Sequence, residues 1–174
     1  DFGRVTPGAR FYFRQVLDPK MAKCGKVLEI GFGNGSLMGY LREKGHSVIG
    51  LEVNEELVRR AVKNGYLAYK GAAWEIAAIQ KIQFDFIIVF DVLEHMRQGE
   101  IVSLFKWVKL HLSENGSFIL KFPEGASPFG RAGQHGDFSH VTVLTRSKVQ
   151  ILCVESGLIL KSYDDDLLSS NTMS

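Results

Sequence analysis

The chain has 174 residues, of which 45% are hydrophobic and 23% are charged, so it is long enough to bury the core of one globular domain. Lysine and arginine total 21 against 19 aspartate and glutamate residues, and the net charge of +2 argues against a nucleic-acid-binding protein. No apolar run approaches the ~20 residues of a membrane span. The two isolated cysteines, Cys24 and Cys153, are interpreted as buried thiols in a reducing compartment, which predicts a cytoplasmic protein.

The first half of the sequence predicts alternating helices and strands. Thr6 and Pro7 form a typical helix start, and a helix is expected over residues 7–17. The next elements expected are strands over residues 27–30, 48–53 and 67–70, and helices over residues 36–44, 54–64 and 73–82.

The second half continues this alternation. Five consecutive apolar residues, 86–90, predict a strand over residues 84–92 that is covered on both faces, as in the centre of a parallel sheet. The later elements expected are a helix over residues 101–112, a strand over 117–122, a helix over 145–157 and a sixth strand over 158–163. Together they predict an α/β fold, a three-layer, doubly wound, mostly parallel sheet of the Rossmann-like type.

A glycine-rich loop follows the first predicted strand, where a doubly wound sheet binds its ligand. Gly31, Gly33 and Gly35 permit close approach of a ligand to the backbone, and two alternatives fit them: the pyrophosphate of a dinucleotide, or the methionine part of S-adenosylmethionine. The dinucleotide pattern G-x-G-x-x-G fails, because residue 36 is Ser. Glu29 would repel a pyrophosphate and attract an ammonium or sulfonium group, so it favours the methyl donor.

An acidic residue, Glu52, ends the second predicted strand, 21 residues after Gly31. A carboxylate at this position accepts hydrogen bonds from the hydroxyl groups of a ribose. Glu52 therefore predicts a nucleoside and does not choose between the two cofactors.

Three segments resemble the class I S-adenosylmethionine-dependent methyltransferases: VLEIGFGNG at 27–35, GLEVN at 50–54 and FDFIIVFDVLEH at 84–95. The last of them resembles the small-molecule group that carries Asp-Val-Leu-Glu-His after the fourth strand. The resemblance implies methyl transfer to a small acceptor, with S-adenosylmethionine as the cofactor. It implies a cofactor site made of Glu29, Gly31, Phe32, Gly33, Gly35, Glu52, Val53, Ala72, Ala73, Asp91, Val92 and Leu93.

The sequence departs from the family pattern in two places. No carboxylate follows the third strand to receive the adenine amino group, so backbone contacts and Ala73 and Trp74 are expected to hold the adenine. The family's seventh strand is expected to be missing, because only an acidic, serine-rich tail follows Tyr163. Residues 1–174 are therefore interpreted as one methyltransferase domain with trimmed ends.

The long connection over residues 123–144 is expected to carry the acceptor site, because loops of this length are usually functional. His135 is the preferred proton acceptor and Asp137 its orienting partner, while His140 either takes part or ties the loop down. Two imidazoles and a carboxylate can also hold a metal ion, but no further ligand is indicated and none is expected. His95 is interpreted as structural, and His46 and His111 as surface residues.

The leading hypothesis is an enzyme that methylates an oxygen atom of a small molecule, with a sugar hydroxyl as the more specific version. The alternatives are an NAD-dependent oxidoreductase and a non-catalytic module that binds S-adenosylmethionine. Neither a nucleic acid nor a membrane is expected as a partner, and the sequence does not indicate an oligomeric state.

Overall fold

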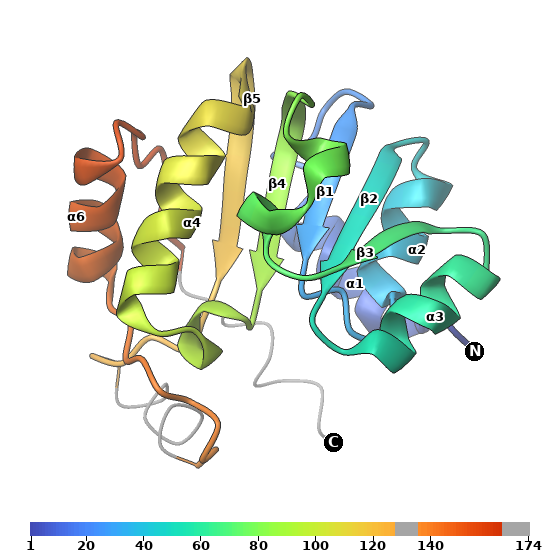
Figure 1. The fold of residues 1–174 in the computed structure, drawn as a ribbon, viewed down its shortest axis with the longest axis horizontal. Coiled ribbons are helices and arrows are strands. Elements are labelled where there is room, and N and C mark those ends of the chain that lie inside the picture. Colours follow the sequence, from blue (N-terminus) through green and yellow to red (C-terminus); the bar gives the residue numbers. More distant parts are fainter. Residues whose placement is uncertain (128–135, 165–174) are drawn as a thin grey trace.

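The computed structural model describes residues 1–127 and 136–164. Its centre is a sheet of five parallel strands in the order β3-β2-β1-β4-β5 (Figure 1). The strands are β1 (Lys26–Ile30), β2 (Ser47–Glu52), β3 (Leu67–Lys70), β4 (Phe84–Phe90) and β5 (Leu112–Lys121). The chain runs outward from β1 to β3 and then returns to β4 beside β1. The strand order reverses between β1 and β4, and ligands bind such sheets beyond this point.

Helices cover both faces of the sheet, as the doubly wound prediction requires. The helices are α1 (Pro7–Val16), α2 (Ser36–Glu43), α3 (Glu55–Lys63), α4 (Gln98–His111) and α6 (Arg146–Glu155). Along β4, Ile87 and Val89 belong to one core cluster and Ile88 to another, so successive side chains enter opposite layers. The three-layer α/β prediction is confirmed.

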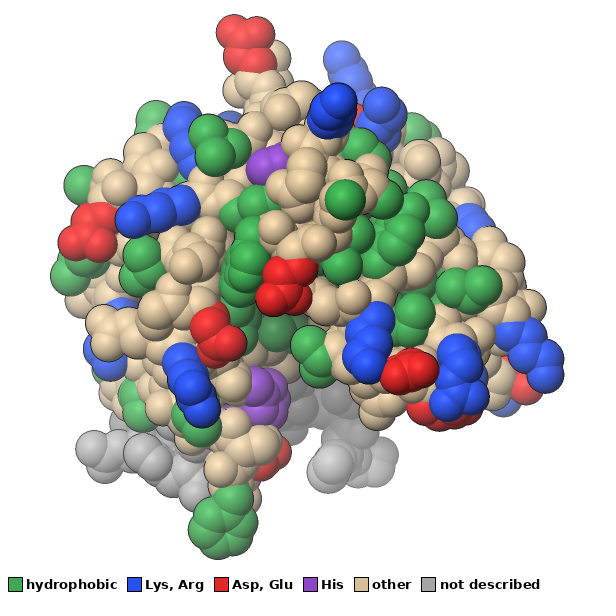
Figure 2. Space-filling view, viewed as in Figure 1, with side chains coloured by type: hydrophobic (Ala, Val, Ile, Leu, Met, Phe, Trp, Pro, Cys, Tyr) green, Lys and Arg blue, Asp and Glu red, His purple; other side chains and the backbone are tan. Residues whose placement is uncertain are grey.

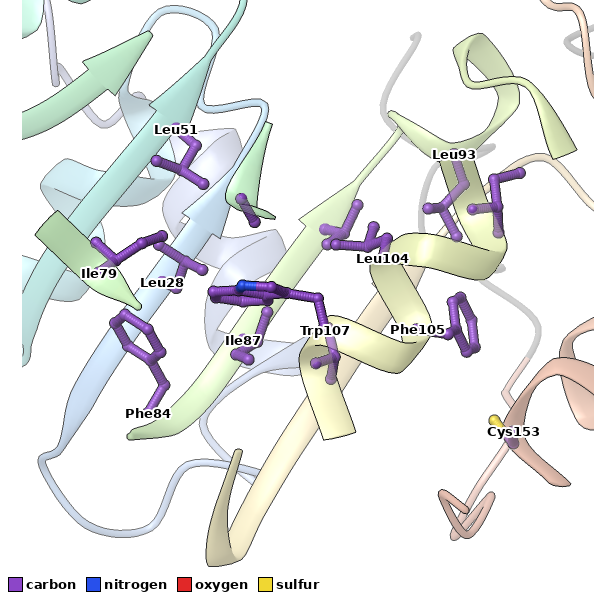
Figure 3. Close-up of a cluster of buried hydrophobic side chains, with 14 of the residues drawn as sticks. Leu28, Leu51, Ile79, Phe84, Ile87, Leu93, Leu104, Phe105, Trp107 and Cys153 are labelled. Atoms are coloured by element: carbon purple, nitrogen blue, oxygen red, sulfur yellow. The ribbon is translucent and has the colours of Figure 1, made fainter. Parts of the chain in front are cut away.

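The larger core cluster lies between the sheet and α4. Trp107 and Leu104 of α4 point toward Leu28 of β1 and Ile87 of β4 in Figure 3. All four side chains are buried. Burying such side chains contributes roughly 1.5–3 kcal/mol each, so this layer holds the carboxyl ends of β1 and β4 in place.

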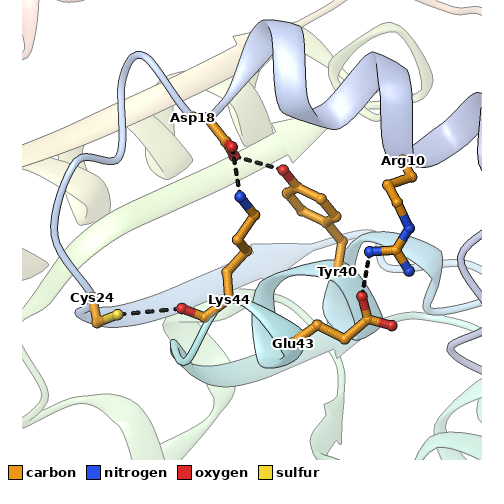
Figure 4. Close-up of polar contacts among 6 residues, drawn as sticks. All are labelled: Arg10, Asp18, Cys24, Tyr40, Glu43 and Lys44. Atoms are coloured by element: carbon orange, nitrogen blue, oxygen red, sulfur yellow. Dashed lines mark hydrogen bonds and ion pairs between the residues drawn. The ribbon is translucent and has the colours of Figure 1, made fainter.

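Polar contacts join α1 to α2 on the other face, as Figure 4 shows. Arg10 Nη1 donates to Glu43 Oε2 at 2.6 Å. Asp18, just beyond α1, accepts hydrogen bonds at 2.6 Å from the Tyr40 hydroxyl and the Lys44 ammonium group. These contacts place α1 against the sheet, next to the site described below.

Two expected elements are wrong. Residues 73–82 form two short 3₁₀ turns, η1 (Ala73–Glu75) and η2 (Ala77–Ile79), rather than one helix. The connection must return from β3 past β2 and β1 to β4, and a 3₁₀ turn covers about 2.0 Å per residue against 1.5 Å in an α-helix. Residues 158–163 form no strand in the structure.

Three side chains are placed differently from the expectation. His46 and His111 are buried, and the His111 ring stacks on Trp107 at 3.9 Å between ring centres. Cys24 is exposed, while Cys153 is buried as expected. Among the described residues, no helix has both the length and the apolar character needed to cross a membrane.

Candidate functional site

A cavity of about 480 Å³ opens at the carboxyl ends of β1 and β4, where the strand order reverses. Its volume lies in the range of small-molecule sites. Aromatic residues of α1 form one wall, and the loop after β1 forms another. Its lining comprises Gly8, Ala9, Phe11, Tyr12, Phe13, Glu29, Phe32, Asn34, Ser36, Leu37, Phe90, Asp91 and Lys121.

The glycine loop joins β1 to α2 in a left-handed backbone conformation. Gly31, Gly33 and Gly35 have φ angles of 78°, 51° and 75°. A Cβ on Gly31 would lie 2.2 Å from Val92 Cγ2, so only glycine fits there. A Cβ on Gly33 would meet no described atom within 4 Å, which leaves space for a ligand to approach the backbone.

Glu29 of β1 lines the cavity and is only 5% exposed. Its Oε2 atom has no hydrogen-bond partner among the described residues. Burial raises the pKa of this carboxyl well above its usual value, and the nearby charge of Glu52 raises it further. A buried carboxyl with an unpartnered oxygen is costly, and a cationic ligand group would satisfy it.

Glu52, at the end of β2, links that strand to the glycine loop. Its Oε2 accepts from the Gly33 N–H at 3.1 Å, and its Oε1 accepts from the N–H groups of Val53 and Asn54. A carboxylate has about four lone-pair positions, so this one can accept one further hydrogen bond without losing another. A ribose diol would therefore share the carboxylate with Gly33 or displace its N–H.

Asp91 follows β4 and has a φ angle of 54°, the only positive φ among the described non-glycine residues. Its N–H donates to the backbone oxygen of Lys121, and its Oδ2 accepts from Lys121 Nζ at 2.8 Å. The same ammonium group lies 5.3 Å from the centre of the Tyr12 ring. A strained backbone held by two bonds to one neighbour is typical of functional sites.

Of the other predicted cofactor residues, only Phe32 lines this cavity. Val92 packs over Gly31. Val53 is 76% exposed beyond β2, and Ala72 and Ala73 begin the turn after β3. Leu93 is fully buried in the core cluster below the site.

A second group of polar side chains lies beyond β4, in η3 (Leu93–His95) and residues 137–140. The rings of His95 and His140 are 4.6 Å apart, and Asp137 Oδ2 lies 3.9 Å from His140 Nε2. Hydrogen bonds from Ser139 lower the pKa of Asp137. His135 lies outside the described residues.

Glu94 completes this group and is absent from the predicted site. It is 2% exposed, and burial raises the pKa of its carboxyl. The adjacent Glu-His pair directly after a buried strand was the sequence signal that could have identified it.

A parallel sheet in this strand order, with a glycine loop after β1 and a carboxylate ending β2, defines a Rossmann-like nucleotide-binding domain. The sequence matches the family model described as "Methyltransferase domain" over residues 9–158, so the chain belongs to this methyltransferase family. The family agrees with the predicted enzyme class and with S-adenosylmethionine, rather than NAD, as the cofactor. A comparison with curated protein sequences gives no match.

Solved structures show the same fold at low sequence identity. A SAM-dependent methyltransferase from Archaeoglobus fulgidus has a TM-score of 0.76 at 17% identity, and the match covers 85% of this chain and 66% of that one. The PH0226 protein from Pyrococcus horikoshii has a TM-score of 0.69 at 22% identity, with 83% and 78% covered. A TehB-like SAM-dependent methyltransferase from Corynebacterium glutamicum has a TM-score of 0.63 at 18% identity, with 83% and 71% covered. This chain thus spans about two thirds to four fifths of those chains.

Proposed function

We propose that this domain transfers the methyl group of S-adenosylmethionine to an oxygen atom of a small-molecule acceptor, and that a sugar hydroxyl is the acceptor group. The buried carboxyl of Glu29 in the cavity wall carries the proposal. The α-ammonium group of the cofactor satisfies such a carboxyl, whereas the pyrophosphate of a dinucleotide would be repelled by it.

S-adenosylmethionine supplies a methyl group that is already activated on a sulfonium. In this proposal Glu29 holds the ammonium group, the glycine-loop N–H groups hold the carboxylate, and Glu52 holds the ribose. The aromatic residues of α1 form an apolar wall beside the reacting groups. Positioning of the two reactants then provides much of the rate acceleration.

An oxygen acceptor is supported by the proton acceptors beyond β4. A hydroxyl must lose its proton to become a nucleophile. Asp137 and His140 belong to the polar group described above, and His135 completes the proposed catalytic set. A sugar is supported by the cavity lining, which combines aromatic rings with the polar groups of Asn34, Asp91 and Lys121.

The finer assignments belong to the same proposal. The Asp-Val-Leu-Glu-His sequence supports membership of the small-molecule group of these enzymes. The two free cysteines support a cytoplasmic location. The near-neutral charge supports a small acceptor over a nucleic acid.

Calorimetric titration with S-adenosylhomocysteine and with NAD tests the cofactor. We expect binding of S-adenosylhomocysteine and no response to NAD; the reverse result would overturn the proposal. Transfer of radiolabelled methyl groups to matched panels of sugar alcohols and sugar amines then tests the acceptor atom. Labelling of the amines alone would exclude an oxygen acceptor.

A further inference from the structure

Three potential metal ligands meet beyond the carboxyl end of β4. Glu94 and His95 are consecutive in η3, and His140 comes from a segment 45 residues further along the chain. Each offers one ligand atom, and the three atoms lie within 4.8 Å of one another. Figure 2 shows histidine and acidic side chains at the surface on the lower part of this face, where β4 and β5 of Figure 1 end.

The backbone holds these two segments together. The N–H groups of Val141 and Thr142 both donate to the Glu94 carbonyl oxygen, at 2.8 and 3.1 Å. The Thr142 hydroxyl donates to the Met96 carbonyl oxygen at 2.6 Å. These bonds flank the three residues on both segments, so their backbone is positioned before any ligand binds.

Two buried atoms of this group have no partner in the part of the chain that the structure describes. They are Oε2 of Glu94 and Nδ1 of His140. A glutamate and a histidine that only stabilise a loop would hydrogen-bond to each other, because leaving both atoms unpaired costs roughly 1–3 kcal/mol for each. Two buried unpaired atoms that belong to potential metal ligands instead suit a cation.

The neighbours of His95 leave one of its nitrogens available as a ligand. The Ser139 hydroxyl donates its single proton to Asp137 Oδ1 at 2.5 Å. At its 3.0 Å contact with His95 Nδ1, the hydroxyl oxygen must therefore accept, which places the imidazole proton on Nδ1. Nε2 then carries the free lone pair. Hydrogen bonding of the second ring nitrogen in this way is typical of metal-bound histidines.

We propose that Glu94, His95 and His140 form a binding site for a divalent transition-metal ion. Two imidazoles and one carboxylate suit Zn²⁺, Co²⁺ or Fe²⁺, whereas Mg²⁺ and Ca²⁺ prefer oxygen ligands alone. Bonds of ~2.1 Å in tetrahedral geometry separate ligand atoms by about 3.4 Å. The ligand atoms, which lie within 4.8 Å of one another, must therefore draw together by up to about 1.4 Å when an ion binds.

Three protein ligands leave at least one coordination position open. An oxygen atom of the acceptor can occupy it, and the ion would lower the pKa of an acceptor hydroxyl there. His140 is then a ligand, and proton acceptance falls to His135. This use of the ion rests on the proposed methyl transfer, but the binding of the ion does not.

Titration of chelator-treated protein with Co²⁺, followed by visible absorption, tests the site in the absence of cofactor and acceptor. We expect one Co²⁺ per chain, d–d bands typical of four or five ligands, and displacement by Zn²⁺. His140→Ala and the nearly isosteric Glu94→Gln should each weaken binding at least about 100-fold. Ser139→Ala, which removes the hydroxyl that accepts from His95 Nδ1 and donates to Asp137, should weaken it about tenfold.

Cys24→Ser is the matched control, because Cys24 is an exposed thiol that could bind these ions by itself. It should bind Co²⁺ as the wild type does, and circular dichroism should show that every variant is folded. Binding that is lost in Cys24→Ser, or retained in Glu94→Gln and His140→Ala, would overturn the proposal. S-adenosylhomocysteine binding, measured separately, distinguishes this failure from failure of the proposed function.

Discussion

The two polar regions at the carboxyl edge of the sheet are built differently. The proposed cofactor side is formed by Glu29, the glycine loop and Glu52, which belong to one β-α-β unit, and a hydrogen bond from the Gly33 N–H joins the loop to Glu52. The group of Glu94, His95 and His140 is assembled from two distant segments, and two of its buried atoms have no partner among the described residues. The first region is a local motif, whereas the second exists only in the folded chain, so mutations should separate their functions.

The largest separation is expected for His140→Ala. Loss of this imidazole should lower the methyl-transfer rate by about 100-fold, in the usual range for a group that handles the acceptor's proton or its ligand. Because His140 does not line the cofactor cavity, the affinity for S-adenosylhomocysteine should stay within about twofold. Parallel rate and calorimetric measurements decide this, and an equal loss in both would mean that the two regions are one site.

Gly31→Ala should damage the cofactor side alone. The new Cβ would clash with Val92 Cγ2 and would occupy a left-handed conformation, which costs about 1–3 kcal/mol. We expect at least a tenfold loss of S-adenosylhomocysteine affinity and a lower melting temperature. The added substitution Val92→Ala should restore part of both. Gly99→Ala in α4 is the matched control, since its Cβ meets no described atom within 4 Å.

Glu29→Gln keeps the shape of the side chain and removes its charge. Charge-assisted hydrogen bonds contribute roughly 1.5–3 kcal/mol, so S-adenosylhomocysteine should bind about 10–100-fold more weakly. The variant without ligand should melt no lower than the wild type, because the costly buried carboxyl is gone. Glu114→Gln, at an exposed position of β5, serves as the control. Unchanged affinity would mean that the ammonium group is held elsewhere.

Glu52→Ala should weaken S-adenosylhomocysteine binding by about tenfold. The substitution removes the ribose acceptor and the partner of the Gly33 N–H. The exposed Glu56→Ala, four residues further on, should change the affinity little. Adenosine binding provides a second measurement: it should weaken as much as that of S-adenosylhomocysteine if Glu52 holds the ribose.

The smallest effect is a dependence of stability on pH. Burial raises the pKa of Glu29 above the ordinary value of 4.5, so the folded chain binds a proton that the unfolded chain has already released. The contribution of Glu29 to the free energy of unfolding is therefore present below pH 4.5 and is lost as the pH rises through the raised pKa. The melting temperature of the wild type should fall relative to Glu29→Gln over this window. Parallel curves for the two proteins would contradict the burial of Glu29.

The positions of the glycine loop and of Glu52 at the edge of the sheet could be predicted from the sequence because the information is local. The positive φ angles of the loop after β1 require glycine, and Glu52 lies at the sheet edge because it ends a strand. Short crossover connections set the order of β1 to β3. The strand expected over residues 67–70 has those bounds in the structure. The proton acceptor His135 stays a prediction, since it lies outside the described residues.

The remainder depended on long-range contacts. The hydrophobic pattern over residues 73–82 did not reveal the distance that the connection from β3 to β4 must cover. The pattern over residues 158–163 did not reveal whether a neighbouring strand is present to pair with this segment. The sequence analysis predicts surface positions for His46 and His111, but both are buried: the Gly25 N–H donates to the His46 ring, and the His111 ring stacks on Trp107.

By itself, the sequence determined the doubly wound class and a glycine loop flanked by carboxylates, because backbone preference and hydrophobic period act over a few residues. Only the tertiary structure decided that one atom of Glu94 and one of His140 are buried with no hydrogen-bond partner among the described residues. Burial and pairing depend on residues that are distant along the chain, and these meet only when the sheet and its connections are complete.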